Sequence, residues 1–396
     1  MRTAGQLDGA DPLASYVSRF VRSDGVVAYL DGNSLGRPLS TSIQRIATFV
    51  ETQWGDRLIR GWDEEWLDLP VRIGDQLGRV ALGAAGGQLT IGDSTTVLLY
   101  KLVRAAAAAR PGRSELVIDR DNFPTDRYVA EGIAAELGMR LVWIDAADAV
   151  TPDAVAAAVT GEAAVVILSH VAYRSGYLSD AEAITAVAHE AGALLVLDLC
   201  HSVGVVPVEL DAWHVDLAVG CTYKYLNGGP GAPAFAYVRE DVQGELRQPI
   251  QGWIGSATPF EMGQGYQPAA GIRGFLSGTP PIIGMLAMQD MIDLIESVGL
   301  AAVRAKSLEL TSFAIELADA LLPEATLATP RDATLRGSHI TLDHPRFAEL
   351  MPGLWARGVL PDFRRPSGIR LGLSPLSTTF AELEFGVRGI AEELAR

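Results

Sequence analysis

The segment from Ala193 to Val238 constrains the fold of this chain more than any other stretch. It contains two short apolar runs, Ala193–Leu197 and Leu217–Gly220, and polar side chains follow each run closely. Short apolar runs that alternate with helical patterns are typical of buried strands in a parallel sheet. Because ligands of such sheets bind beyond the carboxyl ends of the strands, we expect the polar groups after the two runs to meet in one crevice.

An acid and an amine at one sheet edge are what pyridoxal phosphate chemistry requires. Asp198 follows the first run and Lys224 follows the second. The lysine can hold the cofactor aldehyde as a Schiff base, and the acid can keep the pyridine nitrogen protonated, so that the ring accepts electrons. The chain has two other lysines, Lys101 and Lys306, and both lie in helical patterns. A surface lysine in a loop is the alternative for Lys224, but its polar neighbours and the strand that ends at Asp198 favour a cofactor site.

The composition suits a large α/β protein and argues against several partners. The 396 residues are 48% hydrophobic, and no Pro/Ser-rich linker divides them. A single core stops growing at roughly 250–300 residues, so we expect one large domain and a smaller one. The net charge of −16 argues against nucleic acid or an anionic membrane as partner. The first residues lack the pattern of a signal peptide, and the longest apolar stretch is too short for a membrane span.

The two cysteines indicate a reducing compartment. Cys200 and Cys221 both follow predicted buried strands, and no disulfide framework is indicated. We therefore expect a cytoplasmic protein.

Strand and helix patterns alternate through the first half of the chain, as in α/β folds. Between these strands and helices, hydroxyl groups mark a candidate phosphate site, because Ser94, Thr95 and Thr96 precede a helical run whose free N–H groups attract anions. Ser94 as an ordinary helix cap is the alternative. Predicted strands cover 26–30, 88–91, 115–119, 141–144 and 163–168, and predicted helices cover 11–22, 41–58, 70–83, 97–109, 124–137, 151–159, 180–190, 282–297 and 300–322.

Further polar and aromatic residues fall at predicted strand ends or between helices. Phe123 and Asp126 follow the strand at 115–119, and Ser169 with His170 follows the strand at 163–168, so all four are expected at the same crevice. A phenylalanine there can cover the face of a flat cofactor, although a core contact is the default. Trp62 and Trp66 lie in a polar setting, where tryptophans form core or subunit contacts or stack on an aromatic ligand.

Arg370 stands between apolar neighbours, which is unusual for a charged side chain. A buried guanidinium binds a carboxylate, often through two parallel hydrogen bonds. That carboxylate is either an internal Asp or Glu or the α-carboxylate of an amino-acid substrate.

Seven segments together resemble the kynureninase family, fold-type-I pyridoxal phosphate enzymes of the aminotransferase superfamily. An Asp followed later by a Lys is shared across the superfamily, but GNSLG, FPTD, YKYLN and GW in this order are specific. The segments are YLDGNSLGRPL at 29–39, DNFPTDRYV at 121–129, DLCHSVG at 198–204, TYKYLNGGPG at 222–231, GWIG at 252–255, FLSGTPP at 275–281 and GIRLGLSPL at 368–376.

The resemblance implies an α/β fold of aminotransferase fold type I. A large domain with a mainly parallel sheet would bind pyridoxal 5'-phosphate, and a smaller α+β domain would complete the chain. The implied boundaries are an N-terminal segment at 1–60 that packs on the small domain, a large domain at 61–285 and a small C-terminal domain at 286–396.

The resemblance also implies residue roles. Lys224 would carry the cofactor, Asp198 would pair with the pyridinium nitrogen, and Tyr223 would serve as a proton donor. The protein would be a homodimer, with Trp253 and Thr279 reaching the cofactor from the partner subunit. The other implied cofactor contacts are Thr95, Thr96, Phe123, Asp126, Ser169, His201 and Tyr223, the implied substrate contacts are Asn33, Ser34, Trp62 or Trp66, and Arg370, and no metal is implied.

The implied reaction is hydrolytic Cβ–Cγ cleavage of L-kynurenine to an anthranilate and L-alanine, in tryptophan catabolism and the kynurenine pathway towards NAD. Two positions depart from the family pattern: Ser256 stands where histidine is usual, and Ala172 where a polar residue is common. A ring-substituted substrate such as 3-hydroxykynurenine, or a secondary-metabolite pathway, therefore stays open.

Other functions on the same fold are alternatives. A cysteine desulfurase or selenocysteine lyase needs a nucleophilic cysteine on a mobile loop, whereas Cys200 and Cys221 follow apolar strands. Spacing alone does not distinguish an aminotransferase or a decarboxylase-type relative, but alanine release would. A cofactor-binding regulator or an inactive scaffold is disfavoured by the intact Lys–Asp pair and by the lack of a basic patch.

Overall fold

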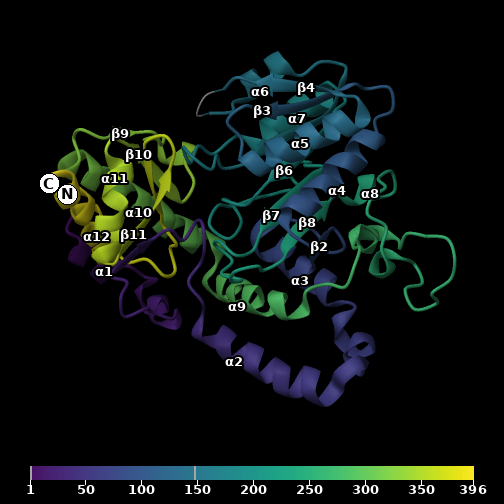
Figure 1. Ribbon diagram of the computed structural model, residues 1–396, viewed down its shortest axis with the longest axis horizontal. Coiled ribbons are helices and arrows are strands. Elements are labelled where there is room, and N and C mark those ends of the chain that lie inside the picture. Colours follow the sequence, from purple (N-terminus) through teal and green to yellow (C-terminus); the bar gives the residue numbers. More distant parts are fainter. Residues whose placement is uncertain (1, 147–148) are drawn as a thin grey trace.

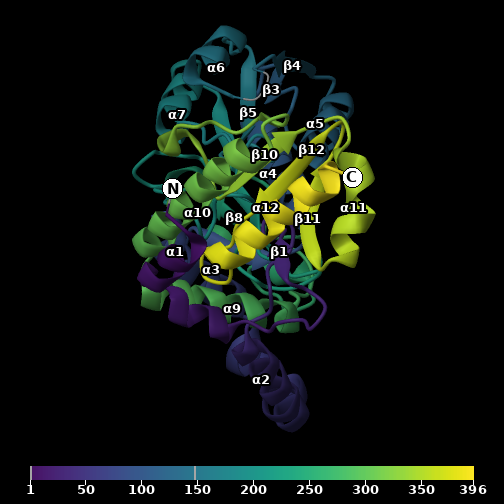
Figure 2. The same ribbon diagram turned by 90° about the vertical axis from the view of Figure 1, so that its left-hand side faces the viewer.

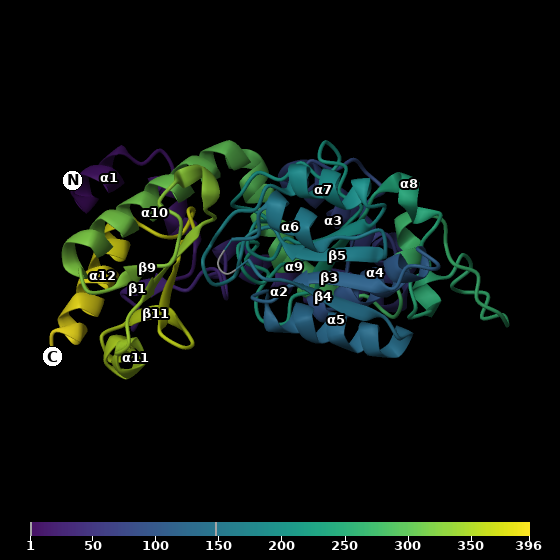
Figure 3. The same cartoon turned by 90° about the horizontal axis from the view of Figure 1, so that it is seen from above.

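Two β-sheets organise the chain in the computed structural model, which describes residues 2–146 and 149–396. The seven-stranded sheet has the order β2-β8-β7-β6-β5-β3-β4, and the five-stranded sheet has the order β1-β11-β12-β10-β9. Figure 1 shows the five-stranded sheet and its helices on the left and the seven-stranded sheet on the right, and Figure 3 shows the same two bodies from above.

The seven-stranded sheet is mainly parallel. Strands β4, β3, β5, β6 and β7 pair in parallel, while β8 runs antiparallel to both β7 and β2. A turn-rich connection without a helix joins β7 to β8, and only antiparallel neighbours can be joined in that way. The strands are β2 (Leu89–Gly92), β3 (Glu115–Asp119), β4 (Arg140–Ile144), β5 (Ala163–Ser169), β6 (Leu194–Asp198), β7 (Leu217–Cys221) and β8 (Ala234–Val238).

Helices cover both faces of this sheet, so its central strands are buried on both sides. Side chains of β6 alternate between the faces: Leu194 and Val196 join the core under α4 and α5, whereas Leu195 packs with α7. This explains why the strands read as continuous apolar runs in the sequence. The helices are α3 (Leu69–Leu77), α4 (Thr95–Ala108), α5 (Pro124–Leu137), α6 (Pro152–Ala158), α7 (Ala181–Glu190), α8 (Glu240–Gln243) and α9 (Ile282–Val298).

The five-stranded sheet joins both ends of the chain. Strand β1 pairs in parallel with β11, and the other pairs are antiparallel. Asp8 holds the N-terminal segment by accepting hydrogen bonds from the backbone N–H groups of Phe380 and Ala381, at 2.8 and 3.0 Å. The elements are β1 (Ala28–Leu30), β9 (Thr326–Leu327), β10 (His339–Asp343), β11 (Val359–Arg364), β12 (Gly368–Gly372), α1 (Ala4–Ala10), α10 (Leu300–Leu321), α11 (Phe347–Ala356) and α12 (Phe380–Leu394).

Figure 2 shows α1 beside α10 and α12, which places the start of the chain on the C-terminal part. The division into an N-terminal segment at 1–60, a large domain at 61–285 and a small domain at 286–396 stays a prediction.

Several predicted elements differ from the structure. The helix expected at 11–22 is wrong: α1 ends at Ala10, and a short 3₁₀ segment covers Ala14–Arg19. Pro12 explains the break, because the residue before a proline disfavours helical backbone. Helix α2 (Ser40–Thr48) continues into a π-helical segment, Phe49–Asp56, and the two form an arm that projects from the body (Figures 1 and 2). In the described part of the chain, no helix combines the length and apolar character of a membrane span.

Candidate active site

The carboxyl ends of four parallel strands converge at one edge of the large sheet. Ser169, the last residue of β5, pairs in register with Asp198, the last residue of β6. Lys224 follows the adjacent strand β7 by three residues, and Asp126 lies in the first turn of α5, which follows β3. The structure therefore brings together the acid, the amine and the serine that the sequence predicted at this edge.

Lys224 is buried and has a defined partner. Its Nζ lies 3.1 Å from Nε2 of His201 and 5.9 Å from the ring centroids of both Phe123 and Tyr223. Burial and the nearby Lys224 charge hold the pKa of His201 well below its usual range. The imidazole is therefore neutral, and its Nε2 can accept a hydrogen bond from the lysine amine.

Two carboxyl groups meet beside this lysine. The carboxyl group of Asp126 lies close enough to Asp198 to be affected by its charge, and the backbone N–H of Cys200 donates to Oδ1 of Asp198 at 2.6 Å. Burial and the charge of Asp198 raise the pKa of Asp126 well above its usual range. Two adjacent buried carboxylates cannot both ionise easily, so Asp126 keeps its proton.

The start of α4 offers an anion site. The Oγ of Ser94 caps the helix by accepting a hydrogen bond from the backbone N–H of Val97 at 3.4 Å. The Oγ1 of Thr95 is buried and has no hydrogen-bond partner among the described residues, while Thr96 is exposed. Free N–H groups and a hydroxyl at a helix start suit a phosphate.

These groups fit pyridoxal phosphate by their chemistry. Besides Thr95, Asp126 has a buried oxygen, Oδ2, that lacks a hydrogen-bond partner among the described residues. Buried polar atoms without partners are rare in folded proteins and call for a ligand or water. A lysine, an acid pair, an aromatic ring and an anion site are the groups that such a cofactor needs.

Arg370, on β12, reaches the same region from the small sheet. It is 1% exposed, and its Nη2 lies 2.8 Å from both Oγ of Ser34 and Oδ2 of Asp362, while Nη1 donates to the carbonyl of Tyr173 at 2.7 Å. The internal carboxylate that the sequence left open is therefore Asp362. The Nε of Arg370 has no hydrogen-bond partner within the described chain, so one donor is free for a ligand.

Two further polar residues with buried, unpaired side chains lie near Arg370. Asn33 is fully buried, and neither of its side-chain polar atoms has a hydrogen-bond partner among the described residues. The same holds for both ring nitrogens of His339, whose centroid lies 5.5 Å from that of His201. His339 pairs with Gly372, and Thr341 pairs with Arg370, so His339 and Arg370 share one face of the small sheet.

Two residues of this region, His339 and Asp31, were not predicted from the sequence. Burial raises the pKa of Asp31 to about 6, and the nearby carboxylate of Asp362 adds to this effect. A lone histidine in an apolar strand resembles a core residue, and only the pairing of β10 with β12 shows where it lies. Asp31 stands within the YLDGNSLGRPL segment, two residues before Asn33, and this position was the available signal.

The remaining predicted residues form a separate aromatic cluster. The Trp62 ring lies 5.5 Å from Trp66 and 6.1 Å from Trp253, and Trp253 lies 5.9 Å from Phe260. Thr279 is exposed in the segment before α9. The structure thus brings the tryptophans together with one another, and gives no contact of theirs with Lys224 within the described chain.

His170 differs from the expectation. It was predicted to face the crevice, but its ring packs against Trp213 at 5.5 Å and its Nδ1 lies 3.0 Å from Oγ of Ser202.

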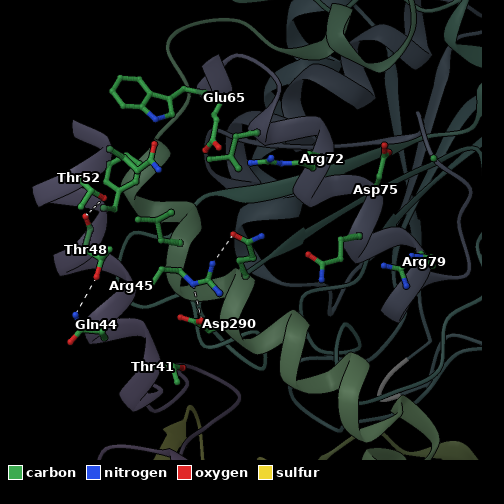
Figure 4. Close-up of a pocket in the computed structure, with 18 of the residues that line it drawn as sticks. Thr41, Gln44, Arg45, Thr48, Thr52, Glu65, Arg72, Asp75, Arg79 and Asp290 are labelled. Atoms are coloured by element: carbon green, nitrogen blue, oxygen red, sulfur yellow. Dashed lines mark hydrogen bonds and ion pairs between the residues drawn. The ribbon is translucent and has the colours of Figure 1, made fainter. Parts of the chain in front are cut away.

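A pocket of about 1140 Å³ lies away from this site, between the arm, α3 and α9. Figure 4 shows Arg45 of the arm directed at Asp290 of α9, and their Nε and Oδ1 atoms lie 2.8 Å apart. A smaller cavity of about 240 Å³ adjoins the site and is lined by residues that include Asn122, Ser169, Ala172 and Tyr173.

Comparison with known proteins decides the family. The chain is 40% identical over 98% of its length to a kynureninase from Pseudomonas fluorescens, of which it covers 94%, and 41% identical over 95% of its length to a kynureninase from Burkholderia pseudomallei, strain 1106a, of which it covers 91%. The chain belongs to the kynureninase family. Residues 303–389 match the model of the kynureninase C-terminal domain, and residues 117–208 match that of the DegT/DnrJ/EryC1/StrS aminotransferase family.

Solved structures show the fold. An apo cysteine desulfurase from Thermococcus onnurineus NA1 superposes with a TM-score of 0.81 at 18% identity, covering 100% of this chain and 98% of that one. The cystine C-S lyase C-DES in complex with cysteine persulfide gives 0.79 at 18% identity, covering 92% and 97%. The kynureninase family and the fold-type-I architecture predicted from the sequence are confirmed, and pyridoxal phosphate is the cofactor of this family.

Proposed function

We propose that this protein hydrolyses the Cβ–Cγ bond of L-kynurenine or a ring-substituted kynurenine, releasing an anthranilate and L-alanine. The observation that carries the proposal is the meeting of Lys224, His201 and the Asp126–Asp198 pair at one sheet edge, in a chain 40% identical to a kynureninase. Cytoplasmic location and a place in tryptophan catabolism and the kynurenine pathway belong to the same proposal.

Each end of the cofactor has residues suited to it. Thr95 and the N-terminus of α4, with Thr96 and Ser169, would hold the phosphate, and Phe123 would cover the ring. Asp198, supported by the proton on Asp126, would pair with the ring nitrogen. When bound, pyridoxal phosphate supplies an electron sink for the charge that develops at the substrate Cα.

The proton transfers can be assigned to two residues. Lys224 would remove and return the proton at the substrate Cα, with His201 holding its amine in position. Tyr223 would donate the proton that completes alanine. Burial raises the pKa of Tyr223, so its hydroxyl keeps this proton until it is transferred. A positioned proton donor or acceptor contributes roughly 10²–10⁴ in rate.

The small sheet would bind the amino-acid end of the substrate. Arg370 would bind the α-carboxylate through its free Nε, beside Ser34, and the unpaired amide of Asn33 would complete the contact. The pair with Asp362 holds the guanidinium in place before the substrate arrives. Charge-assisted hydrogen bonds of this kind are about twice as strong as neutral ones.

A homodimer with shared sites is part of the proposal. Apolar side chains are exposed on and after the arm and in the segment between α8 and α9, which extends from the body (Figures 1 and 3), as in Ile59 at 77% and Met262 at 74% exposure. Exposed apolar side chains that gather in one place, as Val50, Trp54, Leu58 and Ile59 do in the sequence, are typical of a protein interface. Trp253 and Thr279 lie in this second segment, which supports a contribution of both residues to the site of the partner subunit. Trp62, which packs on Trp253, would lie near the substrate ring in that site.

The desulfurase alternative finds little support in the site. Cys200 and Cys221 are buried at the ends of β6 and β7, and the backbone N–H of Cys221 lies 3.2 Å from Sγ of Cys200. Neither thiol lies on an exposed loop, where a nucleophile for persulfide formation would be needed.

The direct test is product analysis. Purified protein with pyridoxal phosphate is incubated with kynurenine and, separately, with 3-hydroxykynurenine, and the arylamine and alanine are quantified. We expect both products in equal amounts. Transfer of the amino group to an oxo acid, without alanine, would indicate an aminotransferase and overturn the proposal. The ratio of kcat/KM for the two substrates shows the ring preference that Ser256 and Ala172 leave open.

A further inference from the structure

Lys101 is a buried charge that the proposed reaction does not use. It lies on α4, is 1% exposed, and its Nζ lies 2.5 Å from Oδ2 of Asp93 and 3.2 Å from the carbonyl oxygen of Phe275. Burial lowers the pKa of Lys101, and the hydrogen bond with Asp93 opposes that shift. A buried ammonium is tolerated only when acceptors surround it, so both partners are needed to keep Lys101 in place.

The first partner, Asp93, shapes the turn that precedes the candidate phosphate site. Its φ of +47° lies in the left-handed region, which residues other than glycine adopt rarely, although aspartate does so more often than most. The turn joins β2 to Ser94, and the carbonyl of Asp93 accepts a hydrogen bond from the backbone N–H of Ala234 at 3.1 Å. Such backbone persists only when contacts hold it, and here it directs the N-terminus of α4 and the unpaired Thr95 hydroxyl.

The second partner, Phe275, begins the segment that leads to Thr279. The carbonyl of Ser277 in this segment accepts a hydrogen bond from the backbone N–H of Ile254 at 3.1 Å, next to Trp253. One lysine therefore contacts both the turn before the phosphate site and the segment that is attached to Trp253 and Thr279.

We infer that Lys101 is a positioning residue for the phosphate group of pyridoxal phosphate. By pairing with Asp93 and binding the carbonyl of Phe275, it fixes the turn that presents the helix start and Thr95 to the anion. Through the carbonyl of Phe275, Lys101 also fixes the position of the segment that leads to Thr279 relative to that turn. The inference rests on the proposed function only for the identity of the cofactor, because the anion site itself needs no kynurenine.

The test compares Lys101→Met with a matched control, Lys306→Met. Lys306 is the other buried lysine in an ion pair, with Nζ 2.7 Å from Oδ2 of Asp11, and it lies in α10 on the small sheet. Both variants lose one buried pair, but only Lys101 contacts the turn before Thr95. The dissociation constants of pyridoxal phosphate and of pyridoxal, which lacks the phosphate, are measured for each protein by absorbance.

We expect Lys101→Met to weaken pyridoxal phosphate binding by about tenfold or more, the size associated with one hydrogen bond to a charged group, while pyridoxal binding changes little. Lys306→Met should leave both constants unchanged. The inference would be overturned if the two variants bound pyridoxal phosphate with equal dissociation constants. It would also be overturned if Lys101→Met weakened the binding of pyridoxal phosphate and of pyridoxal by the same factor.

A second variant covers the case in which Lys101→Met does not fold. Asp93→Asn keeps the side-chain shape and weakens the same pair from its partly exposed end. This variant should bind pyridoxal phosphate more weakly and pyridoxal as tightly as before. If the ratio of the two dissociation constants stays as in the wild type, the inference is overturned as well. A protein that binds the cofactor with this dependence but does not cleave kynurenine would overturn the proposed function alone.

Discussion

Nζ of Lys224 lies 3.1 Å from Nε2 of His201, and both side chains are buried. Burial of the ring holds the pKa of His201 well below its usual range, and the charge of Lys224 lowers it further. A neutral imidazole can accept a hydrogen bond from the amine, so His201 orients Lys224 at the sheet edge. This contact links the DLCHSVG and TYKYLNGGPG segments of the sequence in space.

Replacing His201 tests this orientation. His201→Phe removes the acceptor and should lower kcat by about 10- to 100-fold, the range for one hydrogen bond to a charged group. His201→Gln keeps an oxygen acceptor and should recover part of the loss. Steady-state kinetics across pH would check this, and equal kcat values for the two variants would contradict the role.

Arg370→Gln should raise KM for kynurenine about 100-fold or more, because the substrate carboxylate loses a charge-assisted partner. In this variant Asp362 would keep its ion pair with Arg364, whose Nε lies 2.6 Å from Oδ2 of Asp362. The substitution therefore does not leave the Asp362 carboxylate without a cationic partner. Arg370→Lys should not restore KM, because an ammonium lacks the planar fork. Competitive inhibition by L-alanine and by L-alaninamide gives the control. In the Arg370 variants, inhibition by L-alanine, which carries the carboxylate, should weaken, whereas inhibition by L-alaninamide should not change.

Asp31→Asn tests whether burying the Asp31 carboxyl group in the substrate-binding region lowers the stability of the folded protein. Burial raises the pKa of Asp31 from 3.8 to about 6 in the folded protein. Between these pH values the folded state binds more protons than the unfolded state, so the stability contributed by this group falls as pH rises through that range. The variant should therefore be more stable than the wild type by up to about 3 kcal/mol near pH 7.

Near pH 4 the same variant should show little gain, because Asp31 is then protonated in the folded protein. Urea unfolding at the two pH values measures the difference. An equal gain at both would mean that the ionisation of Asp31 is not the cause.

Mixing of variants tests shared sites. Lys224→Ala and Trp253→Ala should each be impaired. If Trp253 serves the partner's site, a hybrid dimer contains one site with both native residues, so a refolded mixture should regain part of the activity. Lys224→Ala mixed with Asp198→Ala is the control and should stay inactive, because both residues serve the same site. No recovery in the first mixture would contradict sharing.

The central strands could be predicted because helices bury both of their faces. The apolar runs before Asp198 and before Lys224 are β6 and β7, and the polar residues after them meet at one edge. Strand β8 was not predicted, since its antiparallel pairing depends on the short path back from β7 rather than on any period in the sequence.

The small sheet was harder to predict, because its site residues depend on pairings between distant segments. Arg370 pointed to a carboxylate partner, but Asp362 becomes that partner only through the β11–β12 pairing. His339 carried no signal of its own, and its place beside Arg370 follows from the register of β10 on β12. The break after α1 was a local effect of Pro12 that the helical pattern concealed.

The most direct measurement is the site of covalent attachment of the cofactor. The protein with bound pyridoxal phosphate is reduced with borohydride, digested, and its peptides are identified by mass spectrometry. Because the chain has only three lysines, the result is unambiguous. We predict the reduced cofactor on Lys224 alone, and attachment to Lys101 or Lys306, or none at all, would contradict the account.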